Sequence, residues 1–180
     1  MKDYLQSEHT GIEHIVTGER AKKVSLYTPR LEDLWFREAF LSDPDTMSYN
    51  NAWGGTIPFP RESWESWYND WVTAKDGRHF YRYLKNADGE FVGEVAYHIM
   101  GKRNICMADV IVASKYRGRG YGKEGLFLLC EQTKANGIDC IYDNIAVDNP
   151  AIKLFEEAGF LEESRAEGLI FLKKQLRDRG

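Results

Sequence analysis

From His79 onward the apolar residues recur at every second position, and this pattern restricts the fold more than any other feature of the chain. Two runs, HFYRYLK and EFVGEVAYHIM, are joined by Asn86-Ala87-Asp88-Gly89, a sequence typical of a hairpin turn. A second turn at residues 101–104 leads into the further run ICMADVIVA. Three successive strands with short connections predict a largely antiparallel sheet.

The flanking segments add helices and strands in alternation. A strand at 24–27 precedes a helix with Thr28 as cap and Pro29 at its first position, and a second helix follows Pro60. Residues 121–135 predict a helix, DCIYDNIAV a strand, NPAIKLFEEAG a short helix, and FLEES and LIFLKK closing strands. The order β-α-α-β-β-β-α-β-α-β-β predicts an α+β (mixed α/β) domain around one sheet. We expect this domain to span 24–180, after an N-terminal extension at 1–23 that is a strand or an arm.

The charge and composition of the chain argue against several classes of binding partner. The net charge of −4 argues against general nucleic-acid binding, and the chain lacks 18 consecutive apolar residues or an apolar signal core. We therefore expect a cytoplasmic protein with no membrane partner. The three cysteines form no C-x-x-C pair and the four histidines show no metal-ligand spacing, so we expect no metal.

The stretch ASKYRGRGYGKEG gathers four cations among four glycines in this acidic chain, which indicates an anionic ligand. A magnesium-dependent P-loop is excluded, because Arg117 stands where glycine is required and Glu124 where Ser or Thr is required. A dinucleotide motif, G-x-G-x-x-G, is present at Gly120, Gly122 and Gly125, as in a nicotinamide-dependent oxidoreductase. Polar residues separate it from its strand, and no repeating βαβ pattern precedes it, so this alternative is weaker.

Two segments together carry a family resemblance. VIVASKYRGRGYG resembles the pyrophosphate loop of the GNAT superfamily of acetyl-CoA-dependent N-acetyltransferases, and VDNPAIKLFEEAGF resembles that family's second signature. They occur in the family's order, with a helix and a strand between them. More loosely, DTMSYN followed by a tryptophan-rich helix is similar to spermidine and ribosomal-protein acetyltransferases. The resemblance implies a mostly antiparallel twisted sheet with splayed central strands and flanking helices, in a molecule that is often a homodimer.

The resemblance also implies where acetyl-CoA binds. Its pyrophosphate is expected on the backbone amides of the loop Arg117, Gly118, Arg119, Gly120, Tyr121 and Gly122. The pantetheine arm is expected to pair with the backbone of Val110, Ile111 and Val112, in a gap beside the strand at 140–147. Asn149 matches the family's cofactor-side asparagine, although capping the helix behind Pro150 is an equally good role. Small glycines and a helix N-terminus suit a diphosphate physically.

Position 155 departs from the family pattern. Many relatives have tyrosine there to protonate the leaving thiolate, and Phe155 cannot donate a proton. The acceptor amine must also lose a proton, and two acids within strand patterns, Glu94 and Asp109, are candidate bases, with Glu94 preferred and His98 as a lesser relay candidate. The alternative for each acid is a water-facing position on the sheet.

We therefore expect an N-acetyltransferase that acts on a primary amine of a small molecule or peptide by direct attack. Acidic and aromatic residues in and after the loop at 43–60 suggest a cationic amine, such as a polyamine or aminoglycoside; they are Asp43, Asp45, Tyr49, Trp53 and Glu62. The alternative is a non-catalytic acyl-CoA-binding module on the same fold, which Phe155 favours.

Overall fold

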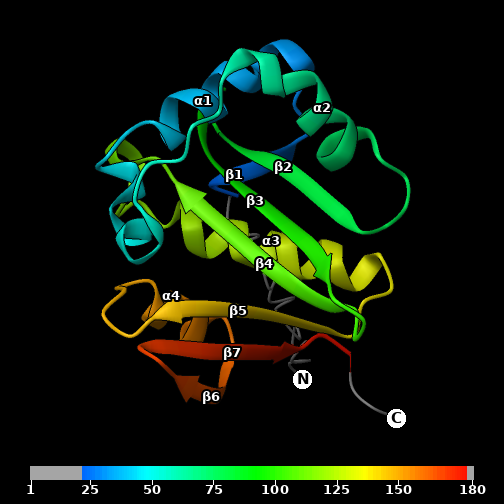
Figure 1. Cartoon of the computed structure of the whole chain (residues 1–180), viewed down its shortest axis with the longest axis vertical. Helices are drawn as coiled ribbons and strands as arrows, with labels where there is room; N and C mark the ends of the chain where they lie inside the picture. Colours follow the sequence, from blue (N-terminus) through cyan, green and yellow to red (C-terminus); the bar gives the residue numbers. More distant parts are fainter. Residues whose placement is uncertain (1–21, 178–180) are drawn as a thin grey trace, which may run out of the picture.

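A seven-stranded sheet in the order β1-β2-β3-β4-β5-β7-β6 organises the chain (Figure 1). The structure is a computed structural model that describes residues 22–177, so residues 1–21 of the expected N-terminal extension lie outside the described residues. All neighbouring strands are antiparallel except β4 and β5, which are parallel. The strands are β1 (Val24–Tyr27), β2 (His79–Asn86), β3 (Phe91–Met100), β4 (Ile105–Val112), β5 (Cys140–Ala146), β6 (Leu161–Ala166) and β7 (Leu169–Gln175).

Helical segments connect these strands. They are the 3₁₀ turns η1 (Leu31–Leu34), η2 (Thr46–Trp53), η3 (Arg61–Ser63) and η5 (Ser114–Tyr116), the π-turn η4 (Asn69–Thr73), and the helices α1 (Trp35–Leu41), α2 (Trp64–Tyr68), α3 (Tyr121–Ala135) and α4 (Ile152–Glu157). Between residues 22 and 177 no helix has both the length and the apolar character needed to cross a membrane. The order of the strands and main helices confirms the predicted α+β arrangement, and a single parallel pair excludes the doubly wound dinucleotide-binding fold.

The predicted meander of β2, β3 and β4 is confirmed. Antiparallel pairing runs from His79 opposite His98 in β2–β3 and from Gly93 opposite Val112 in β3–β4. Gly93 permits an unusually close approach of the two strands, because a Cβ atom there would lie 2.2 Å from the carbonyl oxygen of Ile111. This contact fixes the end of β4 against β3.

Different helices cover the two faces of the sheet. Helix α3 buries the predicted stripe of Leu126, Leu129, Cys130 and Thr133 against one face. On the other face Phe36 of α1 packs edge-on against Tyr83, and Trp67 of α2 packs edge-on against Tyr81. Helices therefore cover both faces of the sheet around β2 and β3.

Two predicted helix starts are wrong. The first helical segment begins at Leu31 and not at Pro29, because the Asp33 carboxylate accepts a hydrogen bond from the backbone N–H of Arg30 at 2.9 Å and makes Arg30 the cap. Helix α4 begins at Ile152 and not at Pro150, because the side-chain oxygen of Asn149 holds the N–H of Ala151 in a preceding turn. In addition, the expected loop at 43–60 contains the 3₁₀ turn η2.

Candidate active site

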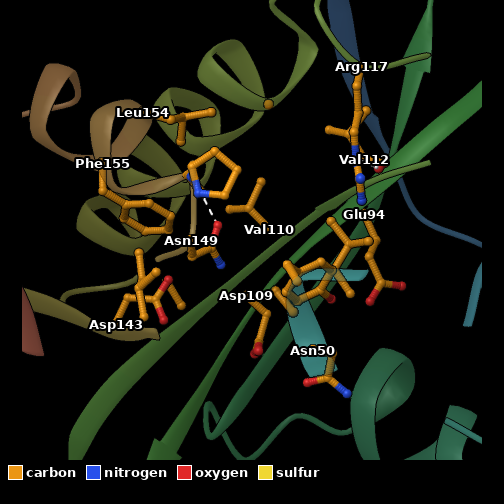
Figure 2. Close-up of a pocket in the computed structure, with 18 of the residues that line it drawn as sticks. Asn50, Glu94, Asp109, Val110, Val112, Arg117, Asp143, Asn149, Leu154 and Phe155 are labelled. Atoms are coloured by element: carbon orange, nitrogen blue, oxygen red, sulfur yellow. Dashed lines mark hydrogen bonds between the residues drawn. The ribbon is translucent and has the colours of Figure 1, made fainter. Parts of the chain in front are cut away.

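Strands β4 and β5 separate soon after they meet. Their one paired position is Met107 opposite Tyr142, whereas β3 and β4 stay paired along the whole length of β4. A cleft of about 910 Å³ opens at this divergence and is lined by Val110, Ile111 and Val112 of β4. Figure 2 shows it between β4 and the segment that carries Asn149 and α4. The splayed central strands expected from the resemblance are present, and they leave strand edges without a neighbour.

The glycine-rich loop closes one end of this cleft. Gly118 and Gly120 have φ angles of 77° and 83°, a left-handed conformation that favours glycine, and α3 begins directly after them. Within residues 22–177, the backbone N–H groups of 118–122 donate no hydrogen bond, and the first bond of the helix runs from Glu124 N to Gly120 O. Free donors of this kind at the N-terminus of a long helix are suited to hold an anion.

The cations of this loop divide into different roles. The guanidinium of Arg117 donates to the carbonyl oxygens of Val112, Asp45 and Thr46 and thereby ties η2 to the end of β4. Lys123 lines the cleft and pairs with Glu157 at 2.8 Å. Arg119 and Lys115 lie against the Tyr116 ring and do not line the cleft. The four cationic side chains are therefore engaged with other groups, whereas the backbone N–H groups of 118–122 are not.

The sequence did not predict a fifth cation beside the loop, Lys23. The ammonium group of Lys23 donates to the carbonyl oxygen of Arg119 at 2.9 Å and would lie 2.8 Å from a Cβ atom at Gly120. The backbone N–H of Lys23 also donates to the Glu124 carboxylate at 2.9 Å. No local pattern indicates this residue, since it reaches the loop only because β1 passes beside α3.

Asn149 and Phe155 both line the cleft, opposite β4. The side-chain oxygen of Asn149 accepts from Ala151 N at 2.9 Å, and among the described residues its amide nitrogen has no acceptor. Asn149 thus holds the turn before α4 and keeps a donor free for a ligand. Phe155 is 4% exposed, packs edge-on against Phe160, and brings no donor to the cleft.

Glu94 is buried within the cleft wall and bound on several sides. Its carboxylate forms an ion pair with Arg37 and also accepts from the hydroxyl of Tyr81. The Arg37 guanidinium in turn stacks on the Trp67 ring, 4.4 Å from the centroid. Burial raises the pKa of Glu94, and the charge of Arg37 opposes this rise. This arrangement gives Glu94 a firm position but engages both of its oxygens.

Asp109 lies on the same face of the sheet, nearer the opening. Its side chain is 44% exposed, and one oxygen lies 3.2 Å from Nδ1 of His98 on β3. The His98 ring contacts Trp71, whose centroid is 5.7 Å away, and all three side chains line the cleft. The structure therefore brings Asp109 and His98 together. The sequence did not predict this contact.

The residues expected to wall an acceptor site are only partly in place. Tyr49 lines the cleft, whereas Asp45 and Glu62 do not, and the side chain of Trp53 lies outside the described residues. The Asp43 carboxylate instead accepts from the Thr46 backbone and, at 3.0 Å, from the Ser114 hydroxyl. Hydrogen bonds from Thr46 and Ser114 lower the pKa of Asp43, which supports a role in holding η2.

Asp143 of β5 also lines the cleft and was missed. Its side chain lies on the same face of β5 as Ile141 and Ile145, which are both buried. An acid between apolar residues of a strand is the same signal that singled out Glu94 and Asp109, so the sequence contained the indication.

Comparisons with known proteins agree with this geometry. Residues 31–160 match the model of the Acetyltransferase (GNAT) family. A comparison with curated proteins gives no match. Solved structures with a similar fold include spermidine N-acetyltransferase from Vibrio cholerae in complex with CoA and spermine, which is 21% identical over 86% of this chain and 96% of that chain, with a TM-score of 0.68.

Two further structures have the same fold. An N-acetyltransferase from Staphylococcus aureus Mu50 is 18% identical over 86% of this chain and 99% of that chain, with a TM-score of 0.68. The protein yncA from Salmonella typhimurium, solved with acetyl-CoA, is 15% identical over 87% of this chain and 96% of that chain, with a TM-score of 0.66. The family match covers most of the chain and includes the loop, the splayed strands and the Asn149 turn. The chain belongs to the GNAT acetyltransferase family.

Proposed function

We propose that this chain transfers an acetyl group from acetyl-CoA to a primary amine by direct attack of the amine. The observation that carries the proposal is the single paired position between β4 and β5, which opens a cleft beside a loop of free backbone N–H groups. When bound, acetyl-CoA supplies an acetyl group activated as a thioester. Its amide-bearing arm needs strand edges and its diphosphate needs N–H donors, and the cleft offers both.

The proposed binding roles follow from these contacts. The backbone N–H groups of 118–122 and the N-terminus of α3 hold the diphosphate, and the backbone of Val110–Val112 pairs with the arm. The free amide nitrogen of Asn149 faces the same ligand. Arg117 acts through the backbone, since its side chain is engaged by η2.

Two carboxylates are proposed to take the proton that the acceptor ammonium must lose. Glu94 remains a prediction, but its oxygens already accept from Arg37 and Tyr81. The contacts favour Asp109, which is half-exposed and touches His98. A proton accepted by Asp109 can pass through the imidazole of His98 toward solvent.

The charge of the cleft supports a cationic acceptor such as a polyamine, an aminoglycoside or a peptide amine. Arg37 is neutralised by Glu94, so Asp109 faces an acceptor beside the aromatic rings of Trp71 and Tyr49. Carboxylates and aromatic faces are the groups that bind ammonium ions. The Vibrio cholerae neighbour, whose structure holds spermine, is in keeping with this class.

The alternative is an acyl-CoA-binding module without catalysis, and Phe155 is the observation that favours it. Calorimetric titration with acetyl-CoA, followed by a thiol-release assay over a library of amines, tests both. Binding with turnover on cationic amines supports the enzyme, and binding without turnover on any amine supports the module. Absence of binding would overturn both.

A further inference from the structure

Asp143 is a carboxylate that the proposed reaction leaves unused. One of its oxygens accepts from the backbone N–H of Asn144 at 2.7 Å, and among residues 22–177 the other oxygen has no hydrogen-bond donor. Figure 2 shows Asp143 at the cleft on the side of Phe155, across from Asp109. A free carboxyl oxygen is therefore available where β4 and β5 diverge.

The surroundings of Asp143 favour its neutral form. The strand partner opposite it is the buried Leu172, and its neighbours on the same face of β5 are apolar. Burial, followed by the charge of Asp109, raises its pKa well above the usual value for aspartate, and the N–H of Asn144 opposes this rise. The charged and titratable groups nearest in the fold are Asp109 of β4, His98 of β3, Lys123 of α3, Asp148 after β5 and Lys174 of β7. The cleft is also lined by the paired Arg37 and Glu94, by Arg117, and by the tyrosines Tyr49, Tyr81, Tyr116 and Tyr121.

The reaction requires a proton at this end of the cleft. Breaking the C–S bond leaves an electron pair on sulfur, and a donor near the sulfur assists by protonating it. Phe155 cannot supply that proton. The strand edges that would hold the arm of acetyl-CoA lead to the point where β4 and β5 meet, and Asp143 follows directly after the paired Tyr142.

Other donors in the cleft wall are engaged or lie elsewhere. The hydroxyl of Tyr81 donates to Glu94, and that of Tyr116 donates to Glu90 at 3.1 Å. Tyr49 contacts the sulfur of Met47 at 3.7 Å. Tyr121 is the first residue of α3 and lies at the loop end, where the diphosphate is proposed to bind.

We propose that Asp143 is the catalytic acid of the acetyl transfer and donates its carboxylic proton to the leaving sulfur. This inference rests on the proposed function. As the C–N bond to the amine forms, the C–S bond breaks, its electron pair stays on sulfur, and sulfur takes the proton of Asp143. The proton that the acceptor ammonium loses before attack leaves through Asp109 and His98. The second proton, which the nitrogen loses after acylation, passes to solvent. Solvent then reprotonates Asp143 through the open cleft.

The first test compares Asp143→Asn, Phe155→Tyr and the double variant, with acetyl-CoA and an amine found in the library screen. Asparagine keeps the oxygen that accepts from Asn144 but carries no acidic proton. We expect kcat to fall about tenfold or more, at the low end of acid catalysis because thiols leave readily. The affinity for acetyl-CoA should stay within about twofold. Phe155→Tyr should recover the rate in the Asp143→Asn background.

The matched control is Asp139→Asn, a carboxylate just before β5 that is exposed, pairs with Arg177 and does not line the cleft. It should leave kcat unchanged. The wild-type rate should decline as pH rises through the pKa of Asp143, and Asp143→Asn should lose this decline. Equal rates and equal pH profiles for wild type and Asp143→Asn would overturn the acid role.

A second test does not depend on turnover. Infrared spectra of the ligand-free protein over a pH titration should show the carbonyl stretch of a protonated carboxylic acid that persists above the pH at which an ordinary aspartate ionises. Wild type and Asp139→Asn should show this band, and Asp143→Asn should lack it. An Asp143 that ionises like an ordinary aspartate would contradict the proposal even if the wild type acetylates amines. If the wild type acetylates no amine, the proposed function fails and the acid role with it. If the wild type acetylates amines and Asp143→Asn keeps the wild-type rate and pH profile, only the assignment of Asp143 is overturned.

Discussion

The buried pair of Arg37 and Glu94 gives the sharpest test of how the site is held together. Their side chains are 16% and 3% exposed, and the pair links α1 to β3 beneath the cleft. Glu94→Gln removes the negative charge but keeps the shape, and Arg37→Met removes the cation and keeps an apolar stem against Trp67. Each single variant leaves one buried group without its partner, whereas the double variant leaves neither.

The expected magnitudes follow from this burial. Removing one member of a buried ion pair costs about 3–5 kcal/mol. Glu94→Gln should be near the lower end, since the amide oxygen can still accept from Tyr81. Arg37→Met should cost less at pH 5 than at pH 8, because burial already raises the pKa of Glu94 and protonation removes the uncompensated charge. The double variant should be less destabilised than the sum of the single variants by about 2–3 kcal/mol.

Urea denaturation of the wild type, the two single variants and the double variant measures this coupling, and the rate of acetyl transfer in the folded variants decides the role of Glu94. If Glu94 supports the fold and Asp109 takes the proton, the double variant should regain much of the rate that Glu94→Gln loses. If Glu94 is the base, the double variant stays inactive. Single-variant costs below about 1 kcal/mol that simply add would refute the reasoning about the buried pair.

Three further predictions concern other parts of the site. Gly120→Asp should abolish acetyl-CoA binding in a calorimetric titration, because it places a charged side chain at φ 83° among the free N–H groups, whereas Gly101→Asp, at φ 62° in open space, should bind normally. Gly93→Ala should lower the free energy of unfolding by about 3 kcal/mol in urea, because its Cβ would meet a backbone oxygen at 2.2 Å. The raised pKa of Asp143 means that the folded state binds the proton more tightly, so wild-type stability should fall as pH rises from about 4 toward that pKa, and Asp143→Asn should lack this slope in urea titrations at several pH values. An equal slope in both proteins would contradict that assignment.

The parts of the fold that the sequence predicted are those that local chemistry decides. The meander from β2 to β4 follows from alternating residues and the turn at Asn86–Gly89, and α3 follows from its apolar stripe and the Asn136-Gly137 stop. The helix starts near Pro29 and Pro150 were misplaced because competing side-chain contacts from Asp33 and Asn149 shifted the boundary. A capping residue at a plausible position does not reveal which N–H it will bind.

The residues of the site likewise include some that local motifs predict and others that only tertiary contacts bring into place. The glycine loop and Asn149 are contiguous motifs, so the sequence contained them. No motif distinguishes Arg37 from other polar residues in its helical pattern. Its stacking on Trp67 exists only because α1 and α2 pack on the same face of the sheet. Lys23 reaches Gly120 across the sheet edge. Such residues depend on contacts far apart in the chain, which periodicity does not encode.

The divergence of β4 and β5 is built in before any ligand arrives. On one side, β4 is paired with β3 along its whole length, and Gly93 allows the backbones to meet closely at Ile111. On the other side, β5 is paired with β7 from Cys140 to Ala146. The two halves of the sheet are each held by a full ladder and joined at Met107 and Tyr142. The strand edges are therefore open in the ligand-free protein, and the proposed ligand arm would pair with them without a prior cost of separating the strands.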